Sequence, residues 1–243
     1  MIKYLLICVN YKSDDVLQQF LESVHQAAER VKDQMDVDIR IADNSENNLG
    51  YLGGALPIYN KEARKYHFVS ISNVDLSLAL DFFEQLLNVD TKGIGWIAPD
   101  IYTDKIDRHE NPHMLSRPTK YYFAMWNMIY SSTWIYRIYN QLHLLKSKVE
   151  KVYPTCDIYA GHGSFMLLTK AFTNQYSELH FPGFMYGEEI YMAELVHRAE
   201  LKVQYCPTLH ITNIGNINTG LINQAQKSKW SKESLRAIKQ FFE

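Results

Sequence analysis

The sequence predicts an α/β protein with a mostly parallel central sheet and helices on both faces. Three short apolar runs in the first third of the chain each end in polar residues, and helix-length amphipathic segments separate them, which is the order of a βαβ fold. In open α/β sheets the ligand binds outside the carboxyl ends of the strands, so we expect a site at that edge. The runs are residues 4–9, 37–42 and 67–72, and they lead into Asn10-Tyr11-Lys12, Asp43-Asn44-Ser45 and Asn73-Val74-Asp75.

The first hundred residues alternate strands with helices. Ser13 can cap a helix after the first strand, and apolar residues recur at helical spacing from Val16 to Val31. A Gly-rich turn over residues 48–55 precedes a second helix, expected at about residues 57–65. The remaining elements expected here are a helix near residues 80–87 and a strand over residues 93–98.

The rest of the chain is less regular. A polar loop is expected over residues 102–118, followed by a segment, residues 121–139, that is dense in Tyr and Trp. We interpret this segment as a partly buried amphipathic helix. An interfacial or acceptor-binding surface is the alternative, because Tyr and Trp favour boundaries between apolar and wet surroundings. The later elements expected are strands over residues 164–169 and 201–205, a helix reaching about residue 199, and a C-terminal helix over residues 221–243.

Composition excludes several classes of protein. The 243 residues carry a formal net charge of −2, which gives no general attraction to nucleic acid. Cys8, Cys156 and Cys206 are too few and too scattered for a disulfide framework or a zinc site. The apolar run at the N-terminus is too short to span a membrane. We therefore expect a cytoplasmic protein without a nucleic-acid partner.

Two polar ends of the predicted strands suit the binding of a charged ligand. Asn73 and Asp75 lie on the same side of a strand end, where their oxygens could hold a hard cation that neutralises a diphosphate; a simple turn is the alternative. Asp43 is followed by Gly50, Gly53 and Gly54, whose backbone could approach a ligand closely, unless the segment is only a polar loop. These glycines match neither a dinucleotide fingerprint nor a phosphate-loop motif.

The pair Glu188-Glu189 follows a loop with apolar anchors and opens a helix. A carboxylate beside a pocket could act as a general base, whereas the alternative interpretation is a charge pair that complements the helix dipole. Among the scattered histidines, His162 between two glycines is placed best for a ligand.

Six segments in order resemble those of family 2 glycosyltransferases with the GT-A fold, in the branch of the rhamnosyltransferase-like enzymes. They span about 180 residues of the chain. The segments are Val9-Asn10-Tyr11, Ala42-Asp43-Asn44-Ser45, Asn48-Leu49-Gly50-Tyr51-Leu52-Gly53-Gly54-Ala55, Asn73-Val74-Asp75, Gly161-His162-Gly163-Ser164-Phe165-Met166-Leu167 and Phe184-Met185-Tyr186-Gly187-Glu188-Glu189.

This resemblance implies an inverting transfer of a sugar from a dTDP- or UDP-sugar, assisted by Mn or Mg. It implies that Asp75 and Asn73 hold the metal, that Asp43 contacts the nucleobase, and that Glu189 is the catalytic base, with Glu188 beside it. The other implied donor-binding residues are Asn10, Tyr11, Asn44, Gly50, Gly53, Gly54 and Asn73, and the implied acceptor-binding residues are His162 and Tyr186.

The chain also departs from the family pattern. The base position is Glu where the family usually has Asp, Tyr191 stands where a second Asp often occurs, and Val74 replaces the Pro of the metal motif. Asn213 stands near the place of a His that often helps to hold the metal. These departures leave open a relative that binds nucleotide or glycan without catalysis.

The resemblance further implies one catalytic domain over residues 1–243. Residues 1–100 would bind the nucleotide, residues 101–220 the acceptor, and residues 221–243 would form the C-terminal helix. We expect a glycan or lipid-linked acceptor, a role in cell-surface polysaccharide synthesis, and a peripheral contact of residues 121–139 with the inner face of the membrane. A sugar nucleotidyltransferase is a further alternative, although the chain has no early Gly-rich, Arg-containing loop for a nucleoside triphosphate.

Overall fold

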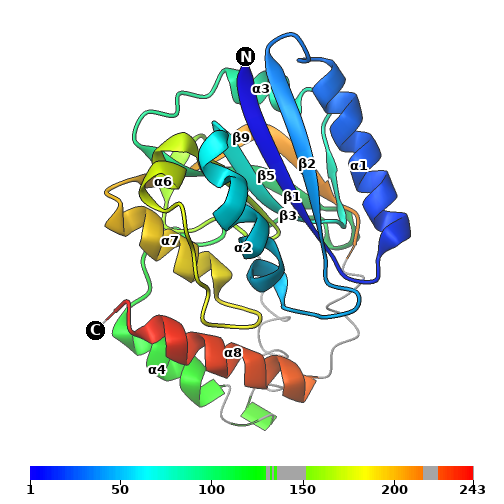
Figure 1. Cartoon of the computed structure of the whole chain (residues 1–243). Coiled ribbons are helices and arrows are strands. Elements are labelled where there is room, and N and C mark those ends of the chain that lie inside the picture. The colour runs from blue at the N-terminus through cyan, green and yellow to red at the C-terminus, as the bar shows by residue number, and fades with distance from the viewer. Residues whose placement is uncertain (130–131, 133, 136–151, 216–223, 243) are drawn as a thin grey trace.

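The computed structural model describes residues 1–129, 132, 134–135, 152–215 and 224–242. Helices lie on both sides of a central sheet (Figure 1). The strands are β1 (Ile2–Asn10), β2 (Met35–Asp43), β3 (Phe68–Asn73), β4 (Leu76–Leu78), β5 (Ile94–Thr103), β6 (Arg108–His109), β7 (Cys156–Ile158), β8 (Phe165–Thr169) and β9 (Lys202–Asn213). The helices are α1 (Asp14–Glu29), α2 (Tyr51–Glu62), α3 (Phe82–Leu87), α4 (Lys120–Ile129), α6 (Lys170–Gln175), α7 (Glu188–Arg198) and α8 (Gln224–Lys239).

The first three strands meet at one edge of the sheet, as predicted. β1 lies between β2 and β3 and is parallel to both. Asn10 at the end of β1 pairs with Asp43 at the end of β2, and Val9 pairs with Asn73 at the end of β3. The three polar strand ends therefore lie side by side.

The second half of the sheet brings further residues to the same edge. The order is β2-β1-β3-β8-β5-β9-β4, with β6 and β7 on the side of this path. β8 runs antiparallel to both of its neighbours, β3 and β5, while β5 and β9 are parallel. Because β8 is antiparallel to β3, its first residue lies at the carboxyl end of β3, where the amide of Asn73 donates a hydrogen bond to the carbonyl of Ser164 (2.8 Å). The turn before β8 thus reaches the predicted site.

Alternation along β1 builds a core on each face of the sheet, which confirms the predicted α/β class. Leu5 and Ile7 pack with residues of α2, α6 and α7 on one face. Leu6 and Cys8 pack with residues of α1 and α3 on the other. Side chains of a strand point alternately to its two faces, so a continuous apolar run is what a strand covered on both sides requires.

Helix α2 begins earlier than the sequence predicted. It starts at Tyr51 instead of near residue 57, so that Gly53 and Gly54 are helical and Pro57 lies inside the helix. The burial of its Leu52, Ala55, Leu56 and Tyr59 offsets the unfavourable helix propensity of glycine. Two strands are also longer than predicted, because β5 continues to Thr103 and β9 to Asn213.

Ser13 occupies the N-cap position of α1, but its side chain does not cap the helix. The Ser13 hydroxyl donates to the carbonyl of Tyr11 (3.0 Å), and the backbone carbonyl of Ser13 accepts the amides of Val16 and Leu17. The serine therefore stabilises the turn after β1.

Helices α4 and α8 lie side by side, apart from the sheet (Figure 1). The rings of Phe123 in α4 and Phe242 after α8 are 4.4 Å apart. Residues 120–129 form the predicted partly buried helix, and Tyr121, Met125 and Met128 are exposed on its other side. Residues 130–131, 133 and 136–139 of the aromatic segment lie outside the described residues. No helix in the described ranges is long and apolar enough to cross a membrane.

Candidate functional site

A cleft of about 450 Å³ lies at the edge where the polar strand ends meet. It is lined from the N-terminal half of the chain by Val9, Tyr11, Asn44, Asn48, Gly50, Tyr51, Asn73, Val74 and Asp75. From the C-terminal half it is lined by His162, Gly163, Ser164, Met185, Tyr186, Glu188, Glu189, Asn213 and Trp230. Nine of the residues selected from the sequence are therefore brought together here: Tyr11, Asn44, Gly50, Asn73, Asp75, His162, Tyr186, Glu188 and Glu189.

Four other selected residues do not line the cleft. Asn10 is buried, and its Nδ2 donates to Oδ1 of Asp14 (2.7 Å). Asp43 is exposed and accepts the amide of Ser45 (2.9 Å), and hydrogen bonds from Ser45 lower the pKa of this carboxyl. Gly53 and Gly54 lie in α2, so they are not the flexible turn that the sequence suggested. A Cβ on Gly54 would lie 2.6 Å from the Asn44 amide, which shows that this glycine lets α2 approach Asn44.

Three carboxylates from distant parts of the chain converge around Tyr51. The hydroxyl of Tyr51 donates to the carbonyl of Ile71 (2.8 Å). Burial raises the pKa of Tyr51, and the negative charges of Glu188, Glu189 and Asp75 raise it further. The cleft is therefore acidic on the side where the two halves of the chain meet.

The two adjacent glutamates have different surroundings. Glu188 is buried, and its Oε1 accepts the amide of Tyr186 (2.9 Å). Burial, and then the charge of Glu189, raise the pKa of Glu188 to about 8. Glu189 is partly exposed at the cleft surface. The protonated Glu188 thus supports the loop, whereas Glu189 is the accessible carboxylate.

Glu188→Gln is expected to make folding less sensitive to pH. Because the pKa of Glu188 in the folded chain lies above its ordinary value of 4.5, its contribution to stability is full below about pH 4.5 and is lost as the pH rises towards 8. Gln keeps a carbonyl oxygen for the Tyr186 amide and cannot ionise. The difference in melting temperature, variant minus wild type, should therefore grow between pH 5 and pH 8. A difference that stays constant or shrinks would contradict the burial of an ionisable Glu188.

The loop before α7 is held between the Gly-rich turn and α8. Tyr186 and Gly187 have positive φ angles of 71° and 85°. On one side, a Cβ on Gly50 would overlap the carbonyl oxygen of Phe184. On the other, the Ser234 hydroxyl donates to the carbonyl of Met185 (2.8 Å), and the Trp230 ring lies 4.7 Å from that of Phe184. The position of Tyr186 and the two glutamates therefore depends on contacts from both ends of the chain.

Gly50→Ala is expected to displace this loop, and Gly93→Ala provides a matched control. Both glycines have positive φ angles, 79° and 73°, which L side chains rarely adopt, so both alanines carry backbone strain. At Gly50 the ψ angle of −178° adds to this strain, because that region is almost restricted to glycine. Only at Gly50 does the new Cβ meet other atoms, since nothing lies within 4 Å at Gly93. We expect Gly50→Ala to lower the free energy of unfolding by roughly 1–3 kcal/mol more than Gly93→Ala. Equal losses in urea denaturation of the two variants would contradict the contact with Phe184.

His162 lines the same cleft. Burial and the nearby His113 lower its pKa. Nδ1 of the His162 ring lies 2.8 Å from the Ser164 hydroxyl oxygen and accepts the Ser164 amide (3.3 Å). The next residue, Gly163, lies so close to Glu189 that a Cβ would be 2.6 Å from Oε1 of that carboxylate. His162 and Glu189 thus border the same part of the cleft.

The residues around Asp75 fit a hard cation that takes its other ligands from a substrate. Burial raises the pKa of Asp75 to about 6, and the charge of Lys105 counteracts this rise. The amide side chains of Asn73 and Asn213 also line the cleft. Within the described ranges, no group of three or more His, Cys, Asp or Glu side chains could hold a metal. One carboxylate and two amides suit Mg²⁺, which is usually bound through one or two carboxylates and phosphate oxygens.

Tyr51, Asn213 and Trp230 line the cleft although their sequence patterns do not predict them as site residues. Tyr51 lies within a segment that was considered only for its glycines, and Asn213 was noted only as a departure from the family pattern. Trp230 and Ser234 share one face of α8 by their i, i+4 spacing. That spacing predicts that one face of α8 is packed against the protein, but it does not predict that this face lies against the cleft.

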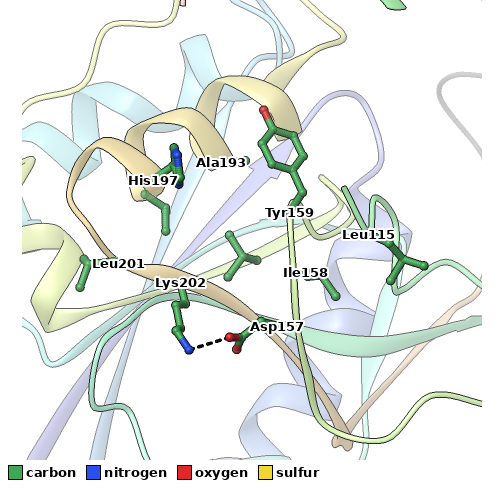
Figure 2. Close-up of a pocket in the computed structure, with 10 residues that line it drawn as sticks. Leu115, Asp157, Ile158, Tyr159, Ala193, His197, Leu201 and Lys202 are labelled. Atoms are coloured by element: carbon green, nitrogen blue, oxygen red, sulfur yellow. Dashed lines mark hydrogen bonds and ion pairs between the residues drawn. The ribbon is translucent and has the colours of Figure 1, made fainter. Parts of the chain in front are cut away.

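A second cavity, of about 280 Å³, lies between α7 and the strands β7 and β9 (Figure 2). Its lining includes Leu115, Ile158 and Leu201, together with an ion pair in which Nζ of Lys202 lies 2.6 Å from Oδ2 of Asp157. None of the residues selected from the sequence lines this cavity. The cleft at the sheet edge is therefore the candidate functional site.

Comparisons with protein-family models and with curated proteins found no match. Solved structures of glycosyltransferases share the fold. The catalytic domain of Drosophila beta1,4galactosyltransferase 7, in complex with xylobiose, is 12% identical with a TM-score of 0.54, over 94% of this chain and 80% of that chain. GalNAc-T7 with UDP, GalNAc and Mn²⁺ is 11% identical with a TM-score of 0.62, over 99% of this chain and 48% of that one.

A third solved structure with this fold is that of a mannosyltransferase. The mannosyltransferase PcManGT from Pyrobaculum calidifontis, in complex with GDP-Man and Mn²⁺, is 10% identical with a TM-score of 0.51, over 89% of this chain and 58% of that chain. The chain thus spans 48% of the length of GalNAc-T7 and 58% of the length of the mannosyltransferase. At these identities the likeness is one of fold, and the fold of this chain is the GT-A fold of these glycosyltransferases.

Proposed function

We propose that the chain is a glycosyltransferase that moves a sugar from a nucleoside-diphosphate donor to a hydroxyl group of a glycan or glycolipid. The main support is that one cleft at the carboxyl edge of the sheet combines Asn73 and Asp75 with Glu189 and His162. Two of the solved structures that share the fold contain UDP or GDP-Man together with Mn²⁺, which agrees with such a donor. We further propose that the enzyme resembles the family 2, rhamnosyltransferase-like branch.

On the donor side, we assign the nucleotide of a UDP- or dTDP-sugar to the ends of β1 and β2 and to the start of α2. Tyr11, Asn44 and Gly50 would contact it directly, since all three line the cleft. Asn10 and Asp43 would act by shaping the two strand ends, because neither lines the cleft. Residues 1–100 would thus form the nucleotide-binding half of one catalytic domain, and residues 101–220 the acceptor-binding half.

On the acceptor side, we assign the role of general base to Glu189. The acceptor hydroxyl would give its proton to Glu189 while its oxygen forms a bond to the anomeric carbon. The bond from that carbon to the diphosphate breaks with its electron pair leaving on the phosphate oxygen, so that the configuration inverts. His162 and Tyr186, which line the same cleft as Glu189, would orient the acceptor.

A divalent cation, Mn or Mg, would be held by Asp75 with Asn73 and Asn213. When bound, it would supply positive charge to the diphosphate leaving group. The protein's own contribution is to fix these oxygens at the strand ends, where the amide of Ile214 donates to the Asp75 carbonyl (3.0 Å) and holds β4 against β9.

A binding and turnover screen tests the proposal. The chain would be tested by thermal shift against UDP-, dTDP- and GDP-sugars with and without Mn²⁺, and the nucleoside diphosphate released by the responding donor would then be measured. We expect a shift with one donor class and release that depends on Mn²⁺ or Mg²⁺. Binding without any release would favour a non-catalytic relative. Pyrophosphate release from a nucleoside triphosphate and a sugar phosphate would instead favour a nucleotidyltransferase.

A place in cell-surface polysaccharide synthesis and a contact with the inner face of the membrane remain predictions. Tyr121, Met125 and Met128 are exposed at i, i+4 and i+7 positions of α4 and would be the residues that contact lipid. Vesicle co-sedimentation at low salt tests this contact, with Met125→Glu as the variant expected to reduce it. Equal sedimentation of the two proteins would contradict it.

A further inference from the structure

A lysine lies next to the cleft edge that carries Asp75 and Asn213. β5 and β9 are parallel, and Thr103 at the end of β5 lies opposite Asn213 at the end of β9. Two residues further along each chain segment, Lys105 therefore lies beside Gly215. The contact is close: a Cβ on Gly215 would overlap Nζ of Lys105 and would lie 3.0 Å from its Cε. The lysine side chain therefore crosses the backbone of Gly215.

The same backbone is joined to the cleft by two hydrogen bonds. The amide of Gly215 donates to Oδ1 of Asn213 (3.1 Å), and the amide of Ile214 donates to the carbonyl of Asp75 (3.0 Å). β4 pairs antiparallel with β9, and its first residue, Leu76, lies opposite Asn213. Asp75 is the residue immediately before Leu76. Lys105, Asp75 and Asn213 consequently share one end of three neighbouring strands.

The acidic lining of the cleft indicates that Lys105 supplies positive charge to a bound diphosphate. The lining residues include the carboxylates Asp75 and Glu189 beside the protonated Glu188, and none of the described lining residues is Lys or Arg. A diphosphate that enters an acidic cleft must be compensated by positive charge, since an unpaired charge removed from water is costly. Lys105 is exposed and lies against Gly215, next to the cleft residue Asn213.

We infer that Lys105 binds the diphosphate of the donor, swinging from Gly215 to the phosphate oxygens beside Asp75. The inference rests on the proposed function. A flexible four-carbon stem with a compact ammonium group suits this movement, since lysine binds phosphate as a point charge without a fixed orientation. Lys105 would then share with the cation at Asp75 the stabilisation of the leaving diphosphate.

Isothermal titration of matched ligands tests this role without an activity assay. Wild type and Lys105→Gln would be titrated with UDP, GDP and dTDP in the presence of Mg²⁺, and then with the nucleoside of the base that binds best. We expect Lys105→Gln to weaken the binding of the diphosphate about 10- to 150-fold, the range of one charge-assisted hydrogen bond. Nucleoside affinity should not change, and Lys105→Arg should retain most of the diphosphate affinity.

Lys61→Gln is the control for a general loss of positive charge. Lys61 is exposed in the last turn of α2, about 15 Å along the helix from the cleft residue Tyr51. Unchanged diphosphate affinity in Lys105→Gln would overturn the role of Lys105 but not the proposed function. An equal loss of diphosphate affinity in Lys61→Gln would do the same. An equal loss of nucleoside and diphosphate affinity would also overturn the role of Lys105, as a structural defect. If wild type binds none of the three nucleoside diphosphates, the proposed function fails as well.

Discussion

Glu189→Gln is expected to lower turnover by about 10² to 10⁴-fold while donor binding persists. Gln keeps the shape of the side chain and removes its ability to accept a proton. Glu189 is the partly exposed member of the pair, and its carboxylate lies against the turn at Gly163, so it is placed to meet an acceptor next to His162. Steady-state turnover and the dissociation constant of the donor should be measured on the same preparation.

Glu188→Gln is the matched control for this prediction. Glu188 is buried, accepts the amide of Tyr186 and has a pKa raised to about 8, so it is protonated at neutral pH and is poorly suited to accept a proton. Its replacement should change the pH dependence of stability more than the chemical step. A larger loss of turnover in Glu188→Gln would reverse the two assignments. A loss of donor affinity instead of turnover in Glu189→Gln would place Glu189 on the donor side.

The first half of the fold follows from local patterns, and this explains why it was predictable. A run such as residues 4–9 is apolar on both faces, which indicates a strand covered on both sides. Because β2, β1 and β3 are parallel neighbours, the polar residues that end each run must meet at one edge. Asp43 shows the limit of this reasoning. Its place at the edge was predictable, but its exposure depends on the turn that Ser45 completes.

The second half depends on long-range packing, which no local pattern reports. Nothing in residues 164–169 shows that β8 runs antiparallel to β3, yet this direction brings His162 to the cleft. The C-terminal helix was expected, but its contact with the loop before α7 is made by side chains about 45 residues apart in sequence, such as Trp230 and Phe184. Burial likewise distinguishes Glu188 from Glu189, although the two are adjacent and chemically identical. Tertiary contacts that override local propensity account for the early start of α2 at Tyr51.

Asp75→Ala is expected to abolish transfer while the fold remains intact. Asp75 is the carboxylate beside Asn73 and Asn213 at the strand ends, where the diphosphate is proposed to bind. The loss of a cation ligand should remove several kcal/mol of stabilisation from the transition state. Turnover should therefore be measured at saturating Mn²⁺, so that a merely weakened cation affinity is compensated. Unchanged turnover under these conditions would contradict the assignment of the metal site.

The stability of a second variant, Asp75→Asn, separates a functional from a structural role for the same residue. Burial raises the pKa of Asp75 from 3.8 to about 6 in the folded chain. Its contribution to stability is therefore full below about pH 3.8 and is lost as the pH rises through 6, so that at pH 7.5 the ionised carboxylate costs on the order of 3 kcal/mol. Asn has nearly the same shape and no charge, so the variant should melt at or above the temperature of wild type at pH 7.5 and close to it at pH 4. If Asp75 destabilises the fold at neutral pH and its replacement also ends turnover, then the residue is retained for function. If Asp75→Asn instead melts well below wild type at pH 7.5, then Asp75 serves the fold, and a loss of activity in Asp75→Ala would not identify a cation ligand.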